Sequence, residues 1–320
     1  MSMETPHAPV LLEEAVTALQ IKPNGIYVDA TFGRGGHSTA ILEQLGEDGR
    51  LIAIDRDPQA VAYANQQFAN ESRFEISHQS FDQIESVAAE KSILGKVDGI
   101  LLDLGVSSPQ LDNAERGFSF MREGPLDMRM DTSSGISAAE WINSAAAEEI
   151  ADVLYLFGEE RLSRRIARKI VSARELEPIN STLKLAEIIK SSFPAKLRHG
   201  PRHPATRSFQ AIRIKVNAEM DQVAKVLKAS INVLADEGRL VVISFHSLED
   251  RLVKRFMRDN SRGKQLPREI PIQGMETGGV LKLIGKAIKP SADEVGINPR
   301  SRSSILRIAE KRPNTTENSA

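Results

Sequence analysis

The sequence of 320 residues contains no cysteine. Disulfides, cysteine-ligated zinc, iron–sulfur clusters and a thiol nucleophile are therefore excluded. There is also no run of about 18 apolar residues, so we expect no transmembrane helix and no membrane partner. Residues 1–9 lack the basic segment that opens a secretory signal, and we expect a cytoplasmic protein.

Motifs of several common enzyme classes are missing as well. There is no H-E-x-x-H zinc motif, no G-x-S-x-G nucleophile elbow and no phosphate-binding P-loop. His199 and His203 stand four residues apart, but Gly200 and Pro201 prevent the helix that would align them as zinc ligands. We therefore expect no metal ion, and neither an α/β-hydrolase nor a P-loop nucleotidase.

Net charge is nearly absent, with 42 Lys and Arg against 43 Asp and Glu, which argues against a nucleic-acid partner. The distribution along the chain changes that interpretation. Residues 1–110 hold 7 basic and 16 acidic residues, a charge of −9, while the remainder carries +8. Four basic clusters, which could also be ordinary solvated faces, favour a polyanion-binding surface; they lie at 161–174, 196–215, 251–268 and 300–312.

Short apolar runs alternate with helical patterns along the first 110 residues. The predicted strands are 26–30, 51–55, 73–77 and 97–103, with helices between them. This alternation predicts an α/β fold with a doubly wound, mainly parallel sheet of Rossmann-like topology. The pattern resumes late in the chain, where a turn at 236–238 leads into predicted strands at 239–244, 280–284 and 304–308.

Between these regions the sequence predicts only helices. They occupy 137–192, and Ser137 with Glu140 forms a capping box that opens one of them. We therefore predict a discontinuous α/β domain, residues 1–110 and 205–320, interrupted by a helical domain at 111–204. An irregular loop is expected near 259–278.

A glycine-rich turn, Thr31–His37, follows the first predicted strand, and Asp55 ends the second strand, 22 residues after Gly33. Glycines let the backbone approach a ligand closely, and a carboxylate at the end of the second strand can accept hydrogen bonds from ribose hydroxyls. A nicotinamide dinucleotide and S-adenosylmethionine both fit this pattern.

Two residues favour S-adenosylmethionine. The third position of the dinucleotide fingerprint G-x-G-x-x-G is Ser38 instead of glycine. More importantly, Asp29 ends the first strand, where its charge would repel a pyrophosphate. S-adenosylmethionine carries an ammonium and a sulfonium group and no phosphate.

The fourth strand runs into Asp103 and a segment of small residues that ends with Pro109 and Gln110. This segment resembles the Asp/Asn-Pro-Pro-aromatic loop of amino-directed methyltransferases, which accepts hydrogen bonds from an exocyclic amine. Leu104 and Gly105 intervene, and no aromatic residue follows Pro109. A tight strand-to-helix turn without a catalytic role is the alternative interpretation.

Several longer motifs together resemble one family, the bacterial MraW family of 16S ribosomal RNA cytosine-N4 methyltransferases (methyltransferase H). The resemblance extends in order over about residues 7–311 and covers the segments 31–37, 53–57, 102–112, 116–120, 124–130, 203–207 and 243–251. It implies the S-adenosylmethionine-dependent methyltransferase fold with an inserted helical domain for RNA recognition. It also implies N4-methylation of a cytosine in the decoding region of 16S rRNA.

By position, the resemblance implies seven cofactor contacts, namely Gly35, Gly36, His37, Asp55, Phe81, Asp103 and Gln110. Phe81 would flank the adenine, and Asp103 would lie beside the cofactor without acting as a proton-transfer base. The catalytic residues stay unassigned.

Three other functions stay open: a DNA amine methyltransferase, a non-catalytic ribosome-assembly factor that binds RNA, and a nicotinamide-dependent dehydrogenase. Asp55 and the glycine turn argue against the assembly factor, and Asp29 argues against the dehydrogenase. The expected partner is 16S rRNA within the small ribosomal subunit, although free RNA and a homodimer are both left open.

Overall fold

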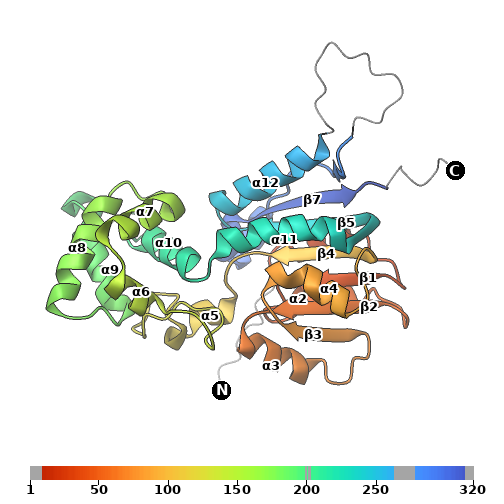
Figure 1. Cartoon of the computed structure of the whole chain (residues 1–320), viewed down its shortest axis with the longest axis horizontal. Helices are drawn as coiled ribbons and strands as arrows, with labels where there is room; N and C mark the ends of the chain where they lie inside the picture. Colours follow the sequence, from red (N-terminus) through yellow and green to blue (C-terminus); the bar gives the residue numbers. More distant parts are fainter. Residues whose placement is uncertain (1–8, 199, 201–202, 263–277, 314–320) are drawn as a thin grey trace, which may run out of the picture. The chain divides into compact units, whose positions relative to one another are not determined.

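The computed structural model describes residues 9–198, 200, 203–262 and 278–313 (Figure 1). The chain folds into two compact units. Residues 1–105 and 221–320 form the α/β unit, and residues 106–220 form the helical unit. The predicted helical domain, 111–204, lies within the helical unit, which extends further along the chain at both ends.

The α/β unit contains a sheet with the strand order β3-β2-β1-β4-β5-β7-β6. Its strands are β1 (Ile26–Asp29), β2 (Arg50–Asp55), β3 (Phe74–His78), β4 (Val97–Asp103), β5 (Leu234–Ser244), β6 (Leu281–Leu283) and β7 (Ile305–Lys311). The pairs from β3 to β5 are parallel, whereas β7 pairs antiparallel with β5 and β6. The predicted α/β fold with a mainly parallel sheet is confirmed.

Helices cover both faces of the sheet, because side chains alternate along each buried strand. Ile52 and Ile54 of β2 pack in one apolar cluster with side chains of α4 and α11. Leu51, the residue before Ile52, points to the opposite face and packs in another cluster with side chains of α1 and α2. The helices of this unit are α1 (Leu12–Leu19), α2 (Gly36–Leu42), α3 (Pro58–Gln67), α4 (Ile84–Glu90), most of α11 (Glu219–Val233), α12 (Ser247–Ser261) and α13 (Ala292–Ile297), with 3-10 turns η1 (Phe81–Gln83) and η4 (Pro299–Ser303).

One sequence prediction in this unit is wrong. The expected turn at 236–238 lies inside β5, which begins at Leu234. The pairing with β4 slips between Leu234 and Arg239, so the extra residues form a bulge. Glu237 takes a positive φ of 64° there, and a Cβ on Gly238 would lie 2.8 Å from two backbone oxygens. The residues typical of a turn therefore mark an irregularity within a strand.

The helical unit has a hydrophobic core of its own, which includes Trp141, Leu154, Ile166 and Phe209. Its helices are α5 (Ser108–Asp112), α6 (Ala138–Ser144), α7 (Ala147–Gly158), α8 (Ser163–Leu176), α9 (Thr182–Ser191) and α10 (Thr206–Val216), with 3-10 turns η2 (Ala114–Arg116) and η3 (Ala195–Leu197). The capping box predicted at Ser137 opens α6, as expected. Because α10 packs in this core, the unit continues beyond the predicted boundary at residue 204.

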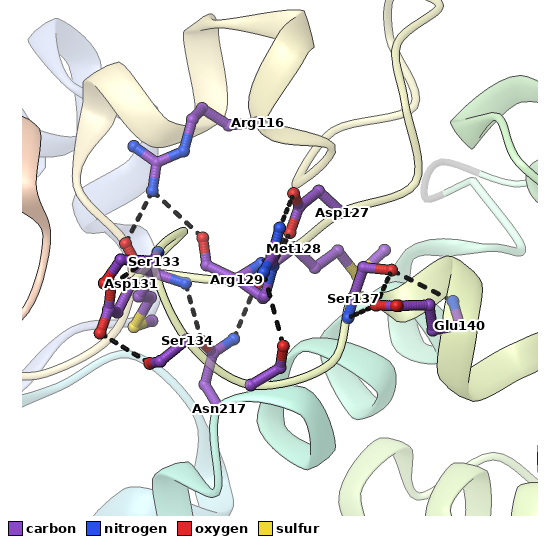
Figure 2. Close-up of polar contacts among 12 residues, drawn as sticks. Arg116, Asp127, Met128, Arg129, Asp131, Ser133, Ser134, Ser137, Glu140 and Asn217 are labelled. Atoms are coloured by element: carbon purple, nitrogen blue, oxygen red, sulfur yellow. Dashed lines mark hydrogen bonds and ion pairs between the residues drawn. The ribbon is translucent and has the colours of Figure 1, made fainter.

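Side chains order the loop that follows η2 (Figure 2). The guanidinium of the buried Arg116 donates to the carbonyl groups of Arg129 and Met130. The Asn217 amide accepts from the Met130 N–H at 2.8 Å and donates to the Met128 carbonyl at 2.7 Å. Met128 takes a φ of 63°, a left-handed conformation that these bonds hold in place. The family-like segment 124–130 therefore has a structural role within the helical unit.

Of the predicted irregular loop at 259–278, residues 263–277 lie outside the described part of the chain, and α12 continues to Ser261. Among the described residues, none of the helices is both long and apolar enough to cross a membrane.

Candidate cofactor site at the carboxyl edge of the sheet

Three aspartates end three neighbouring strands of the sheet. Asp29 ends β1, Asp55 ends β2 and Asp103 ends β4. Because these strands are adjacent and parallel, their carboxyl ends meet at one edge, where ligands of doubly wound folds bind. The structure therefore brings together acidic residues that lie more than twenty positions apart in the sequence.

Asp29 organises the glycine turn from within. Its side chain is buried and accepts hydrogen bonds from the Ser38 hydroxyl at 2.7 Å and from the Thr31 N–H at 3.2 Å. Burial raises the pKa of Asp29, and the bond from Ser38 opposes that rise. Ser38, the departure from the dinucleotide fingerprint, thus supplies a donor that glycine lacks.

Asp55 holds both the glycine turn and the residue that caps α3. Its carboxylate accepts the Gly33 N–H and the Asp57 N–H, each at 2.8 Å. Burial raises the pKa of Asp55 to about 6, the two N–H bonds oppose this, and the charges of Asp57 and Asp29 add to it. The group therefore changes its charge close to neutral pH.

The turn itself requires glycine at both positions that the resemblance assigned to the cofactor. Gly35 has a φ of 73°, and a Cβ there would lie 2.7 Å from the Phe32 ring. A Cβ on Gly36 would lie 2.2 Å from Cγ of Pro9. The absence of side chains lets the backbone pack tightly and leaves the start of α2 open to close approach.

His37 is buried at the start of α2, and its Nε2 lies 3.2 Å from the Val10 carbonyl oxygen. A carbonyl can only accept, so the proton of the neutral ring resides on Nε2. Burial lowers the pKa of His37, which keeps the ring neutral. Its Nδ1 is then an acceptor, 3.8 Å from Oδ2 of Asp103.

Asp103 has an unsatisfied atom at the same place. Its backbone N–H donates to Thr31 Oγ1 at 2.6 Å, but its Oδ1 is buried and has no hydrogen-bond partner within the described part of the chain. Burial raises the pKa of Asp103 well above its usual value, and the charges of Asp29 and Glu249 add to the effect. A buried acceptor without a donor is costly, which indicates that a bound ligand supplies the donor.

Phe81 and Gln110 complete the seven predicted contacts. Phe81 begins η1, three residues after β3 ends, and is partly buried against the core of the α/β unit. Gln110 belongs to the helical unit, where its Oε1 accepts the Ser107 N–H in the capping box of α5. Its contact with a cofactor therefore stays a prediction.

Sequence reasoning missed the roles of Thr31 and Glu249. The Thr31 hydroxyl supports the backbone of Asp103. Glu249 is buried at the start of α12, where it accepts the N–H groups of Phe245 and His246 at 2.8 and 3.2 Å. The capping-box spacing of His246 and Glu249 was the available signal for the second residue.

The set of polar groups at this edge consists mainly of acceptors. Asp29, Asp55, Asp103 and the Nδ1 atom of His37 bring negative charge or lone pairs to this edge. Such a set suits a ligand with an ammonium group and ribose hydroxyls, and it disfavours a pyrophosphate. The residues present therefore fit S-adenosylmethionine.

Comparisons with known proteins agree with this chemistry. The chain is 58% identical over 310 residues to the ribosomal RNA small subunit methyltransferase H of Alteromonas mediterranea, covering 96% of this chain and 98% of the relative. Among solved structures, an rRNA methylase from Streptococcus thermophilus matches at 11% identity, 94% of each chain and a TM-score of 0.41. The N-methyltransferase NodS from Bradyrhizobium japonicum matches at 10% identity, 94% of each chain and a TM-score of 0.41. These two structural likenesses are too weak to bear on function.

The family comparison covers almost the whole chain. Residues 4–312 match the model of the MraW methylase family. That range includes all seven residues predicted from the motifs to contact a cofactor. The chain belongs to the MraW methylase family.

Proposed function

We propose that this chain transfers the methyl group of S-adenosylmethionine to the N4 amine of a cytosine in small-subunit ribosomal RNA. Membership of the MraW methylase family confirms the prediction of an S-adenosylmethionine-dependent methyltransferase that acts on ribosomal RNA. The choice of the N4 amine rests on the motif resemblance. The loop after β4, which begins at Asp103, supports it because amino-directed methyltransferases place a similar loop beside the reacting amine.

The observation that carries this proposal is the orphaned Oδ1 of Asp103, whose other carboxylate oxygen, Oδ2, lies 3.8 Å from the acceptor Nδ1 of His37. An ammonium group has three N–H donors, so it can donate to the Asp103 carboxylate and to the His37 ring. Burial and the charges of Asp29 and Glu249 disfavour ionisation of Asp103, and a positively charged ligand beside it would favour the ionised form. The amino-acid part of S-adenosylmethionine provides such a group.

The residues of the site then act by binding and positioning. Asp55 would accept hydrogen bonds from the ribose hydroxyls, Asp103 and His37 would hold the ammonium, and Phe81 would flank the adenine. When bound, S-adenosylmethionine supplies an electrophilic methyl group on a sulfonium. Alignment of the amine lone pair with that methyl can contribute about 7–11 kcal/mol at best, so a positioned amine needs no covalent intermediate.

The helical unit, which includes the predicted insertion 111–204, is proposed to recognise the RNA. Its separate core and its basic helices support this role. An rRNA substrate also supports the expected cytoplasmic location and a small-subunit partner. A homodimer stays a prediction that sedimentation of the purified protein would test.

Label transfer tests the proposal directly. Purified protein is mixed with methyl-labelled S-adenosylmethionine and small ribosomal subunits from a strain that lacks the enzyme, with protein-free rRNA and DNA in parallel. We expect label in the rRNA, recovered as N4-methylcytidine after nuclease digestion. Label in DNA alone would instead support the alternative function, a DNA amine methyltransferase. Folded wild-type protein that labels no nucleic acid would refute both.

A further inference from the structure

Five exposed cations lie on one face at the start of α8. They are Arg161, Arg164, Arg165, Arg168 and Lys169. Arg161 precedes the helix, and the other four, which lie one, three and four residues apart, share one side of α8. The opposite face, with Ile166 and Ile170, is buried in the core of the helical unit. The exposed side of α8 is therefore entirely basic from Arg164 to Lys169.

These five cations have no acidic partners in the structure as described. The ion pairs of the helical unit involve other basic residues, namely Arg129, Lys184, Arg213 and Lys215. Like charges three and four residues apart on a helix repel one another, so the arrangement costs stability when nothing binds. Packing does not explain it either, because the side chains are exposed.

Part of this face forms a shallow groove of about 320 Å³, lined by Arg165, Arg168, Lys169 and Ser172. The Lys169 ammonium is held at one side, where it donates to the Ser191 carbonyl at 2.9 Å and to its hydroxyl at 3.0 Å. These bonds stabilise the end of α9, which accounts for Lys169. They do not account for the arginines.

The lining chemistry selects the kind of ligand. Guanidinium groups and a hydroxyl match phosphate oxygens and ribose hydroxyls, and guanidinium binds phosphate with two parallel hydrogen bonds. The lining contains no aromatic ring on which a base could stack and no carboxylate. Contacts of this type position a nucleic acid without reading its sequence.

We propose that this α8 groove, together with Arg164 at its edge, binds the sugar–phosphate backbone of the substrate RNA. The inference rests on the proposed function and identifies the surface of the helical unit that binds the substrate. The groove provides affinity that is independent of sequence, and it takes no part in the methyl transfer itself.

The test removes three of the charges without changing the helix. In the groove variant, Arg164→Gln, Arg165→Gln and Arg168→Gln are combined, because glutamine and arginine have similar helix propensity. The control variant combines Lys96→Gln, Lys228→Gln and Lys286→Gln, which removes the same charge from exposed lysines of the α/β unit. Circular dichroism melting and cofactor binding check that both variants fold.

The readout is affinity for protein-free small-subunit rRNA at 50 and 200 mM salt. Each phosphate contact contributes about 0.7–0.9 to the slope of log affinity against log salt concentration. The wild-type affinity falls between 50 and 200 mM salt, and the loss of three contacts should make that fall about 20- to 40-fold smaller. We expect this reduction in the groove variant and an unchanged salt dependence in the control. In methylation assays, KM should rise while kcat at saturating RNA stays the same.

Equal salt dependence and equal KM in the groove and control variants would overturn the proposal that the α8 groove binds RNA. This outcome differs from failure of the proposed function, which would appear as wild-type protein that binds RNA and transfers no label. A loss of kcat without a change in RNA affinity would also contradict the proposal, because the groove is assigned to binding alone.

Discussion

The raised pKa of Asp55 predicts that cofactor affinity depends on pH in a particular direction. Burial holds this pKa at about 6, so the carboxyl is largely protonated at pH 5 and ionised at pH 7. Ribose hydroxyls donate to the ionised form more strongly, and the sulfonium charge also favours it. S-adenosylmethionine should therefore bind more tightly as pH rises through 6.

The magnitude follows from linkage. If only the ionised form binds well, the dissociation constant at pH 5 is about ten times its value at pH 7 for a pKa of about 6. Asp55→Asn removes the charge and leaves a weaker acceptor, and hydrogen bonds to charged groups are worth about 1.5–3 kcal/mol. The variant should thus bind about 10- to 150-fold more weakly at pH 7, with little inflection near pH 6.

Isothermal titration calorimetry of wild-type and Asp55→Asn proteins between pH 5 and pH 7 measures both effects. Asp29 and Asp103 also have raised pKa values, so the difference between the two proteins isolates the contribution of Asp55. A wild-type affinity that is equal at pH 5 and pH 7, or a pH dependence of the same size in both proteins, would refute the assignment of Asp55 as the ribose acceptor.

Two further substitutions test the framework of each unit. Gly35→Ala forces a left-handed residue and brings its Cβ within 2.7 Å of the Phe32 ring, so the free energy of unfolding should fall by about 1–2 kcal/mol from the backbone alone, measured in denaturant. Asn217→Ala leaves backbone groups at 128–130 unpaired, at about 1–3 kcal/mol each, and should lower the unfolding midpoint reported by fluorescence of Trp141 without changing cofactor affinity. Unchanged midpoints would contradict the two explanations.

Local patterns in the sequence were sufficient for much of the α/β unit. The apolar run 51–54 predicts a buried strand, because a strand covered on both faces needs no alternation of polar residues. Parallel strands place their carboxyl ends together, so the sequence pattern alone assigns Asp29, Asp55 and Asp103 to one edge of the sheet. Local signals failed at Glu237 and Gly238, because a bulge and a turn use the same residues.

The sequence by itself thus determined the class of sheet, the glycine turn and the acidic edge, since these depend on near neighbours and on strand geometry. Only the tertiary structure decided which acceptors stay unsatisfied. The approach of His37 to Asp103 and the hydrogen bond from Met130 to Asn217, 87 residues away, join distant parts of the chain. Such contacts are set by packing, which a pattern of neighbouring residues does not encode.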